Sequence, residues 1–110
     1  MKILLKILAA TACLTAILIN VPVQAENASH VRQLLETNRC TQCDLSFASL
    51  QGADLQDAKL SHSNLQGADL RGANLQNADL RDTDLRNADL READLQDANL
   101  SGAKTSGARF

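Results

Sequence analysis

The stretch Ala-Asp-Leu-Arg-Gly-Ala-Asn-Leu, residues 68–75, shows a five-residue pattern in which a small residue stands two positions before each leucine. The pattern runs from Cys43 to Phe110. On an α-helix, residues five apart are rotated by about 140°, so the leucines would scatter around the axis. On a flat strand, they would alternate between the two faces. All the leucines can be buried together only if the chain turns a corner once in every pentad.

Two side chains of each pentad are expected to point inward, because the small residue and the leucine are two positions apart. If four such corners close a coil, successive coils stack at about the 4.8 Å spacing of neighbouring strands. Each buried leucine contributes roughly 1.5–3 kcal/mol of transfer free energy, and the small residue beside it keeps the shaft narrow. The leucines of the pattern are Leu45, Leu50, Leu55, Leu60, Leu65, Leu70, Leu75, Leu80, Leu85, Leu90, Leu95 and Leu100.

This pattern, A-[DN]-L-x-x, resembles the signature of the pentapeptide-repeat family over residues 43–110. The resemblance implies an all-β fold, a right-handed quadrilateral β-helix with four pentads in each coil. It implies coils over residues 43–62, 63–82 and 83–102, followed by a partial coil over 103–110.

In ten pentads, the residue directly before the leucine is Asp or Asn. Such side chains accept local backbone hydrogen bonds, so we interpret them as turn supports rather than as a row of metal-binding carboxylates. A coil of four pentads also aligns residues into columns. One column departs from alanine, and we attribute it to tolerance of small polar residues whose hydroxyls can bond to nearby carbonyls. Its members are Cys43, Ser63, Thr83 and Ala103.

The N-terminal residues have the features of a cleavable signal peptide, residues 1–25. Two lysines precede an apolar run, residues 7–19, and small residues suit cleavage between Ala25 and Glu26. The run is shorter than the ~20 residues of a membrane-spanning helix. Two alternatives stay open: an uncleaved anchor, and a lipoprotein signal at Cys13.

Residues 26–42 form the predicted N-terminal cap, which precedes the repeat domain, residues 43–110. Within it, residues 29–38 are expected to form a short helix with Ser29 as its N-cap. One apolar face of this helix could cover the first coil. That face consists of Val31, Leu34 and Leu35.

Cys40 and Cys43 form a CxxC motif that admits three interpretations. A structural disulfide is favoured, since an exported protein meets an oxidising environment. Dithiol redox chemistry is disfavoured, because the motif lacks the strand-then-helix context that lowers a thiol pKa. Metal binding would need two more ligands, and only His30 and His62 are available, without standard spacing.

The composition points away from catalysis. The net charge is −2, without a basic block for nucleic acid. The sequence contains no phosphate-binding loop and no converging acid–base set, so we expect no enzyme activity, no cofactor and no metal. The favoured function is a structural or protein-interaction module that presents columns of side chains on its flat sides. Two such columns are Gln51, Arg71 and Arg91, and Gln56, Gln76 and Gln96.

The sequence admits two alternative functions. Some members of the family mimic DNA and protect DNA gyrase, but the arginines and the leader of this chain argue against that role. A small thiol oxidoreductase using Cys40 and Cys43 is the other alternative.

We expect an unidentified protein partner, no nucleic acid, and no stable membrane insertion after cleavage. Phe110 is expected to plug the open last coil, through which copies of the chain could form a homo-oligomer. The leader predicts export to the periplasm or the thylakoid lumen, or secretion.

Overall fold

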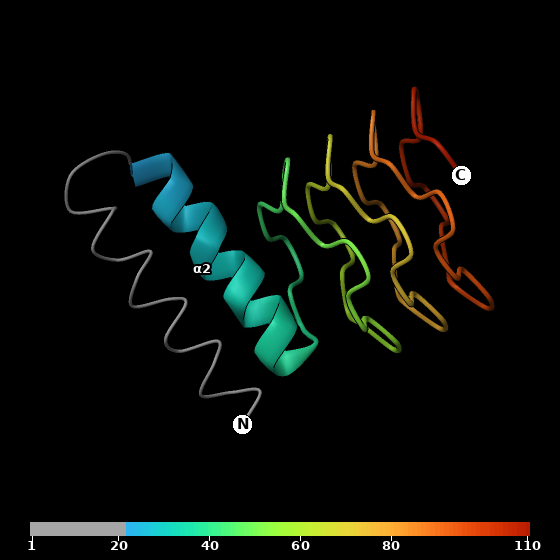
Figure 1. The fold of residues 1–110 in the computed structure, drawn as a ribbon, viewed down its shortest axis with the longest axis horizontal. Helices are drawn as coiled ribbons and strands as arrows, with labels where there is room; N and C mark the ends of the chain where they lie inside the picture. The colour runs from blue at the N-terminus through green and yellow to red at the C-terminus, as the bar shows by residue number, and fades with distance from the viewer. Residues whose placement is uncertain (1–21) are drawn as a thin grey trace.

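The computed structural model describes residues 22–110, with side chains from Asn27 onward. Residues 1–21 of the predicted leader therefore lie outside the described residues. The alternative lipoprotein site at Cys13 lies among them. Helix α2, Pro22–Thr37, crosses the N-terminal end of a stack of coils that leads away to the C-terminus (Figure 1). No helix of the described part has both the length and the apolar character that crossing a membrane requires.

The coils are joined by single parallel bridges rather than by strands. The first bridge joins Arg39 to Lys59, and the last joins Asp89 to Arg109. Each bridge connects residues 20 apart, and successive bridges are five residues apart. No continuous strand occurs in residues 22–110, because each side is too short to pair at more than one position before the chain turns. The predicted solenoid is present, whereas "all-β" describes it only in part.

The corners from residue 45 onward are β-turns, each closed by a hydrogen bond between backbone groups three residues apart. The N–H of Ala53, for example, donates to the carbonyl of Leu50 at 3.1 Å. The residue just before the small residue has a positive φ, as at Gly52 (66°) and Asp57 (60°). Glycine, Asn and Asp tolerate this conformation best, and they occupy most corners. Phe47, with φ 56°, is a bulky exception.

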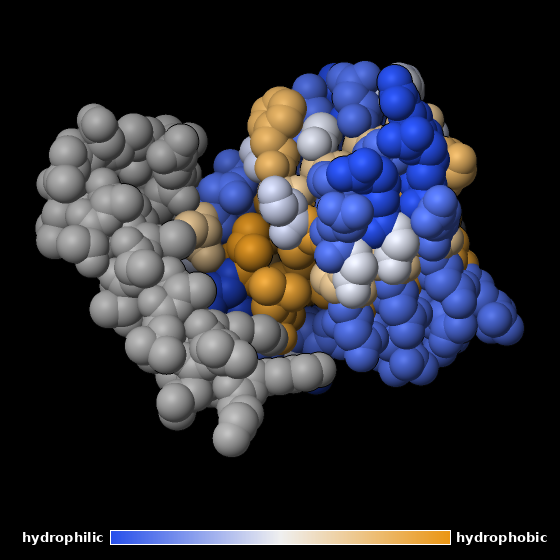
Figure 2. Space-filling model, in the orientation of Figure 1, coloured by the Kyte–Doolittle hydropathy of each residue, from blue (hydrophilic) through white to orange (hydrophobic). Residues whose placement is uncertain are grey.

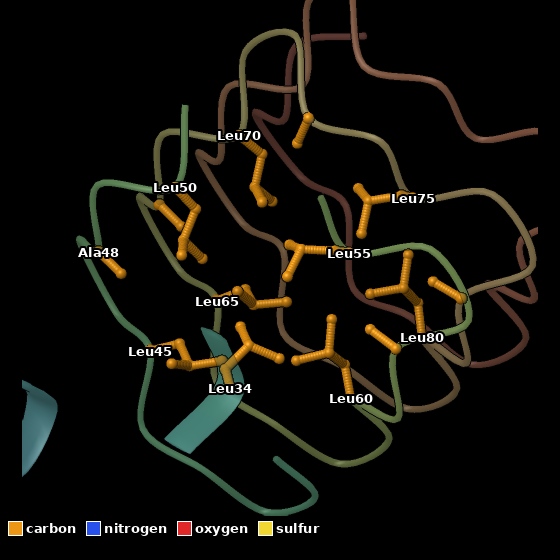
Figure 3. Packing of buried hydrophobic residues seen from close by; sticks show 14 of the residues in the cluster. Leu34, Leu45, Ala48, Leu50, Leu55, Leu60, Leu65, Leu70, Leu75 and Leu80 are labelled. Atoms are coloured by element: carbon orange, nitrogen blue, oxygen red, sulfur yellow. The ribbon is translucent and has the colours of Figure 1, made fainter. Parts of the chain in front are cut away.

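The core is a column of leucines along the solenoid axis (Figure 3). The leucines from Leu45 to Leu90 are at most 2% exposed, and Leu34 of α2 is fully buried against this column. In the last coil, Leu95 and Leu100 are only partly buried, because no further coil of the described residues covers them. Phe110 is 62% exposed, so the prediction that it plugs this coil is wrong.

The predicted helix was too short. Helix α2 starts at Pro22, where a proline suits the first helical turn, so Ser29 lies inside the helix and is not its N-cap. The coil pairing also begins at Arg39, four residues before the predicted boundary at Cys43. It begins there because the N–H of Cys40 donates to the carbonyl of Lys59 at 2.8 Å.

Candidate functional site

Helix α2 is docked on the first coil by side chains that take the place of a preceding coil. In later coils, a backbone N–H such as that of Asn64 donates to the coil before it, here to the carbonyl of Cys43 at 2.9 Å. The corresponding N–H of Asp44 donates instead to Nδ1 of His30 at 2.9 Å. Nδ2 of Asn27 donates to the carbonyl of Ser46 at 2.9 Å. At Asp44 and Ser46, side chains of α2 therefore supply the ladder partners that a preceding coil would provide.

Apolar contact completes this docking. Leu34 projects from α2 toward Leu45 and Leu65 (Figure 3), and Val31 and Leu35 pack beside it. These are the three residues of the apolar face predicted from the sequence. In Figure 2, hydrophobic residues appear where the helix meets the coils, whereas the solenoid surface facing the viewer is mostly hydrophilic.

Cys40 and Cys43 are joined by a disulfide under α2, with Cα atoms 5.4 Å apart. Cys40 is fully buried and Cys43 is 5% exposed, and Sγ of Cys40 lies 3.4 Å from the carbonyl oxygen of His30. A catalytic thiol pair needs access to its substrate. This pair is covered by the helix, so the geometry suits a structural link between the cap and the first coil.

The Ser63 hydroxyl bridges the turn from Cys40 to Cys43, which lacks the closing bond of the other turns. Other turns close through a bond from the small residue to the carbonyl three positions earlier, as from Ala48 to Leu45 at 3.1 Å. In the turn from Cys40 to Cys43, the Ser63 hydroxyl stands between these two groups. It accepts the N–H of Cys43 at 3.2 Å and donates to the carbonyl of Cys40. The bond from the Ser63 hydroxyl to a nearby carbonyl is as predicted, whereas its acceptance of the Cys43 N–H goes beyond that prediction.

Thr83, in the same column, behaves differently. Its hydroxyl donates to the carbonyl of Leu80 at 2.8 Å, within its own turn, and the N–H of Thr83 donates to the same carbonyl at 3.3 Å. Bonding of this hydroxyl to a nearby carbonyl is as predicted. The sequence signal for Ser63 was its place one coil after Cys43.

The histidines do not assemble a metal site with the cysteines. His30 bonds to the backbone of Asp44, and the exposed His62 lies 3.7 Å from the carboxylate of Asp82. Among the residues that the structure describes, no three His, Cys, Asp or Glu side chains are grouped as metal ligands would be.

The Asp and Asn residues before the leucines support turns, as predicted. Each accepts, through Oδ1, the backbone N–H two residues later, as in the 3.0 Å bond from Gln66 to Asn64. The bond recurs at all the Asp and Asn positions of this register. These side chains are therefore occupied by the repeat itself.

Where arginine follows an aspartate by two residues, the two side chains form a bidentate ion pair. In one pair, Nε and Nη2 of Arg91 donate to the Asp89 carboxylate at 2.9 and 2.7 Å. Hydrogen bonding to the arginine lowers the pKa of Asp89 to about 2, and Arg81 does the same for Asp79. The pairs are Asp69–Arg71, Asp79–Arg81, Asp84–Arg86 and Asp89–Arg91. They pair four of the 13 acidic residues of the sequence with arginine.

Charge is distributed unequally over the sides of the solenoid. We call residues 48–52, 68–72 and 88–92 the Arg side, because Arg71 and Arg91 lie in one of its columns. We call residues 53–57, 73–77 and 93–97 the Gln side. The Gln side contains no lysine or arginine, and it holds four aspartates, which are Asp54, Asp57, Asp94 and Asp97. Its middle coil carries Gln76, whose amide donates to the Asp94 carboxylate at 2.6 Å.

The chain is similar to known proteins in both sequence and fold. A family model described as pentapeptide repeats (8 copies) matches residues 39–77 and 68–107. Rfr23, a pentapeptide-repeat protein of the cyanobacterium Cyanothece 51142, is similar with a TM-score of 0.54 and 30% identity. The match covers 66% of this chain and 63% of Rfr23.

Two further solved structures are similar. A pentapeptide-repeat protein from the Arabidopsis thaliana thylakoid lumen has 32% identity and a TM-score of 0.49, with 69% of this chain and 57% of that chain covered. HetL, involved in heterocyst differentiation regulation in a Nostoc cyanobacterium, has 38% identity and a TM-score of 0.38, over 64% of this chain and 38% of HetL. The chain thus spans less than two thirds of each. No curated protein matches it.

Proposed function

The chain belongs to the pentapeptide-repeat family, and from that premise we propose that it is a non-catalytic, exported module that binds another protein. The flat sides of the solenoid present ordered columns of polar side chains to that partner. The right-handed quadrilateral form that the resemblance implies is part of the same proposal. So is the division into a signal peptide (1–25), a cap (26–42) and a repeat domain (43–110).

The observation that carries the proposal is that the Asp, Asn and paired Arg side chains of the repeat already form hydrogen bonds within the chain. Asp and Asn bond to the backbone of their own turns, and the paired arginines bond to those aspartates. No buried side-chain nitrogen or oxygen of the described residues lacks a hydrogen-bond partner. Catalytic sites often retain unpaired or strongly perturbed polar groups. A surface of mutually satisfied groups suits contact with a partner better than chemistry.

The same observation supports this proposal over DNA mimicry and over redox catalysis. A DNA mimic needs an acidic surface around its shaft, and on three of the four sides arginines pair with the aspartates here. A redox catalyst needs an accessible sulfur, and Cys40 and Cys43 lie beneath α2.

Export is proposed on two grounds. The features of residues 1–25 are those of a cleavable signal peptide. A disulfide between Cys40 and Cys43 persists in an oxidising compartment such as the periplasm, the thylakoid lumen or the exterior. The proposed cleavage between Ala25 and Glu26 would retain Asn27, which bonds to the first coil.

Site-specific photo-crosslinking in the producing cells tests the proposal. A photoreactive residue is placed at Gln51 on the Arg side or at Gln56 on the Gln side, both exposed. We expect one position to give a discrete product with a second protein, and we expect unlabelled protein in excess to compete it away. Failure of both positions to give a competable product would overturn the proposal.

A further inference from the structure

We propose that the Arg side is a self-complementary surface on which two copies of the chain pair weakly, side by side, about a two-fold axis parallel to the solenoid axis. This inference is independent of the partner proposed above. It rests on an exposed aromatic ring at one edge of the Arg side, a hollow at the other edge, and a charge pattern between them.

The aromatic ring is that of Phe47, at the corner where the chain enters the Arg side. It is 75% exposed and has a φ of 56°, a strained conformation for a bulky residue. Its ring leans along the axis over the next coil, since a Cβ added to Gly67 would lie 2.5 Å from ring carbon Cε1. The ring thus lies at the height of the second coil.

The hollow lies at the opposite edge of the Arg side, at the same height. Successive coils place Gly52 and Gly72 at that corner, and a Cβ added to either would meet nothing within 4 Å. Beside these glycines is a hollow of about 200 Å³. It is lined by Gln51, Arg71, Arg91 and Glu92.

A two-fold axis parallel to the solenoid axis exchanges the two edges of the side and keeps every height unchanged. The Phe47 ring of one copy then faces the hollow of its partner beside Gly72. There it can stack on bare backbone and on the Arg71 guanidinium, an arrangement that cation–π attraction favours. The reverse contact forms at the other edge, so the interface contains two aromatic anchors.

The charges between these edges are complementary under the same operation. Asp69 and Asp89 occupy one column, and Arg71 and Arg91 occupy the other. After the rotation, each aspartate of one copy faces an arginine of the other at the same height. Only Nε and Nη2 of each arginine donate to the aspartate of its own chain, so Nη1 is available for a second carboxylate.

The expected dimer is weak. Stable interfaces bury about 1,200–2,000 Å² in total, and a side only a few coils high, at about 4.8 Å per coil, offers less. Aromatic anchors dominate the energy of small interfaces, so the Phe47 ring should decide whether the pair forms.

Sedimentation equilibrium over a wide concentration range tests the proposal, using the protein in the form its own cells accumulate. We expect a monomer–dimer equilibrium. Phe47→Asn should raise the dimer Kd by about tenfold or more, without loss of folding, because Asn tolerates a positive φ. Gly72→Asn should do the same by filling the hollow. His62→Asn is the matched control, since it alters a positive-φ corner away from the Arg side and should leave the Kd unchanged.

Two outcomes would overturn the proposal. The first is a strictly monomeric protein at the highest soluble concentration. The second is a dimer that survives both Phe47→Asn and Gly72→Asn. A dimer lost in Phe110→Ser but kept in Phe47→Asn would place the interface at the last coil instead. Far-UV circular dichroism of each variant, compared with the native spectrum, confirms that the mass is measured on folded protein.

Discussion

Replacing Ser63 with alanine removes the hydroxyl that bridges the turn between Cys40 and Cys43. The N–H of Cys43 then loses its acceptor, and the carbonyl of Cys40 loses a donor. Both groups lie in the buried first coil. A buried group left without a partner costs about 1–3 kcal/mol, so we expect Ser63→Ala to lower the free energy of unfolding by about 2–3 kcal/mol.

The size of this loss should depend on the disulfide. Without it, the turn can close as the others do, with the N–H of residue 43 donating to the carbonyl of residue 40. In a Cys40→Ala/Cys43→Ala background, Ser63→Ala should therefore cost less than about 1 kcal/mol. The difference between the two backgrounds is the coupling energy of a double-mutant cycle.

Urea unfolding followed by far-UV circular dichroism measures these energies, since the chain has no tryptophan or tyrosine for fluorescence. Thr83→Val is the control in the same column. Its hydroxyl bonds to the Leu80 carbonyl, which keeps the N–H of Thr83, so its cost should be about 1 kcal/mol or less and independent of the disulfide. Equal losses for Ser63→Ala with and without the cysteines would refute the bridging role.

Three other outcomes are expected. Arg81→Gln should raise the pKa of Asp79 from about 2 toward its ordinary 3.8, as NMR titration would show. The native carboxyl has the lower pKa, so its stabilising contribution is complete above pH 3.8 and is lost as the pH falls toward 2; an acid transition that is identical in the variant would contradict this. Leu65→Ala, in the enclosed core, should lower the free energy of unfolding by about 2–5 kcal/mol in the same urea assay. Leu100→Ala, in the partly exposed last coil, should lower it by about 1–2 kcal/mol. Equal losses would contradict the difference between the covered first coils and the uncovered last coil. Mass spectrometry of the protein from its own cells, without reductant, should show a chain that begins at Glu26 and lacks the two hydrogens of one disulfide, whereas a mass that begins at Met1 would contradict export.

The sequence was sufficient for the features that repeat. A period of five, together with coils of four pentads, predicted that Arg71 would stand in one column with Arg91 and that the leucines would share one core. It also predicted the Asx-type turn supports, because a short-range bond from Oδ1 to the N–H two residues later recurs with the motif.

The sequence did not predict the features that occur only once, because each depends on how α2 docks on the first coil. The docking bonds of Asn27 and His30 reach 14 to 19 residues along the chain, and no local pattern predicts them. The helix start at Pro22 overlaps the predicted cleavage region. The position of Ser63 one coil after Cys43 could be read from the sequence. Its bridging role depends on the missing backbone bond in the turn from Cys40 to Cys43, which only the structure shows.

The parallel bridges between residues 20 apart also determine which insertions and deletions the gene could accept. Adding or removing a whole coil would leave every column on its own side. Deleting a single pentad, such as residues 76–80, would keep the leucines inward while turning all later residues by one side. Arg91 would then no longer stand in line with Arg71. Inserting or deleting pentads therefore rotates the later coils relative to the earlier ones. Such a change would rearrange the charged and polar columns on the surface while the leucines stay in the core.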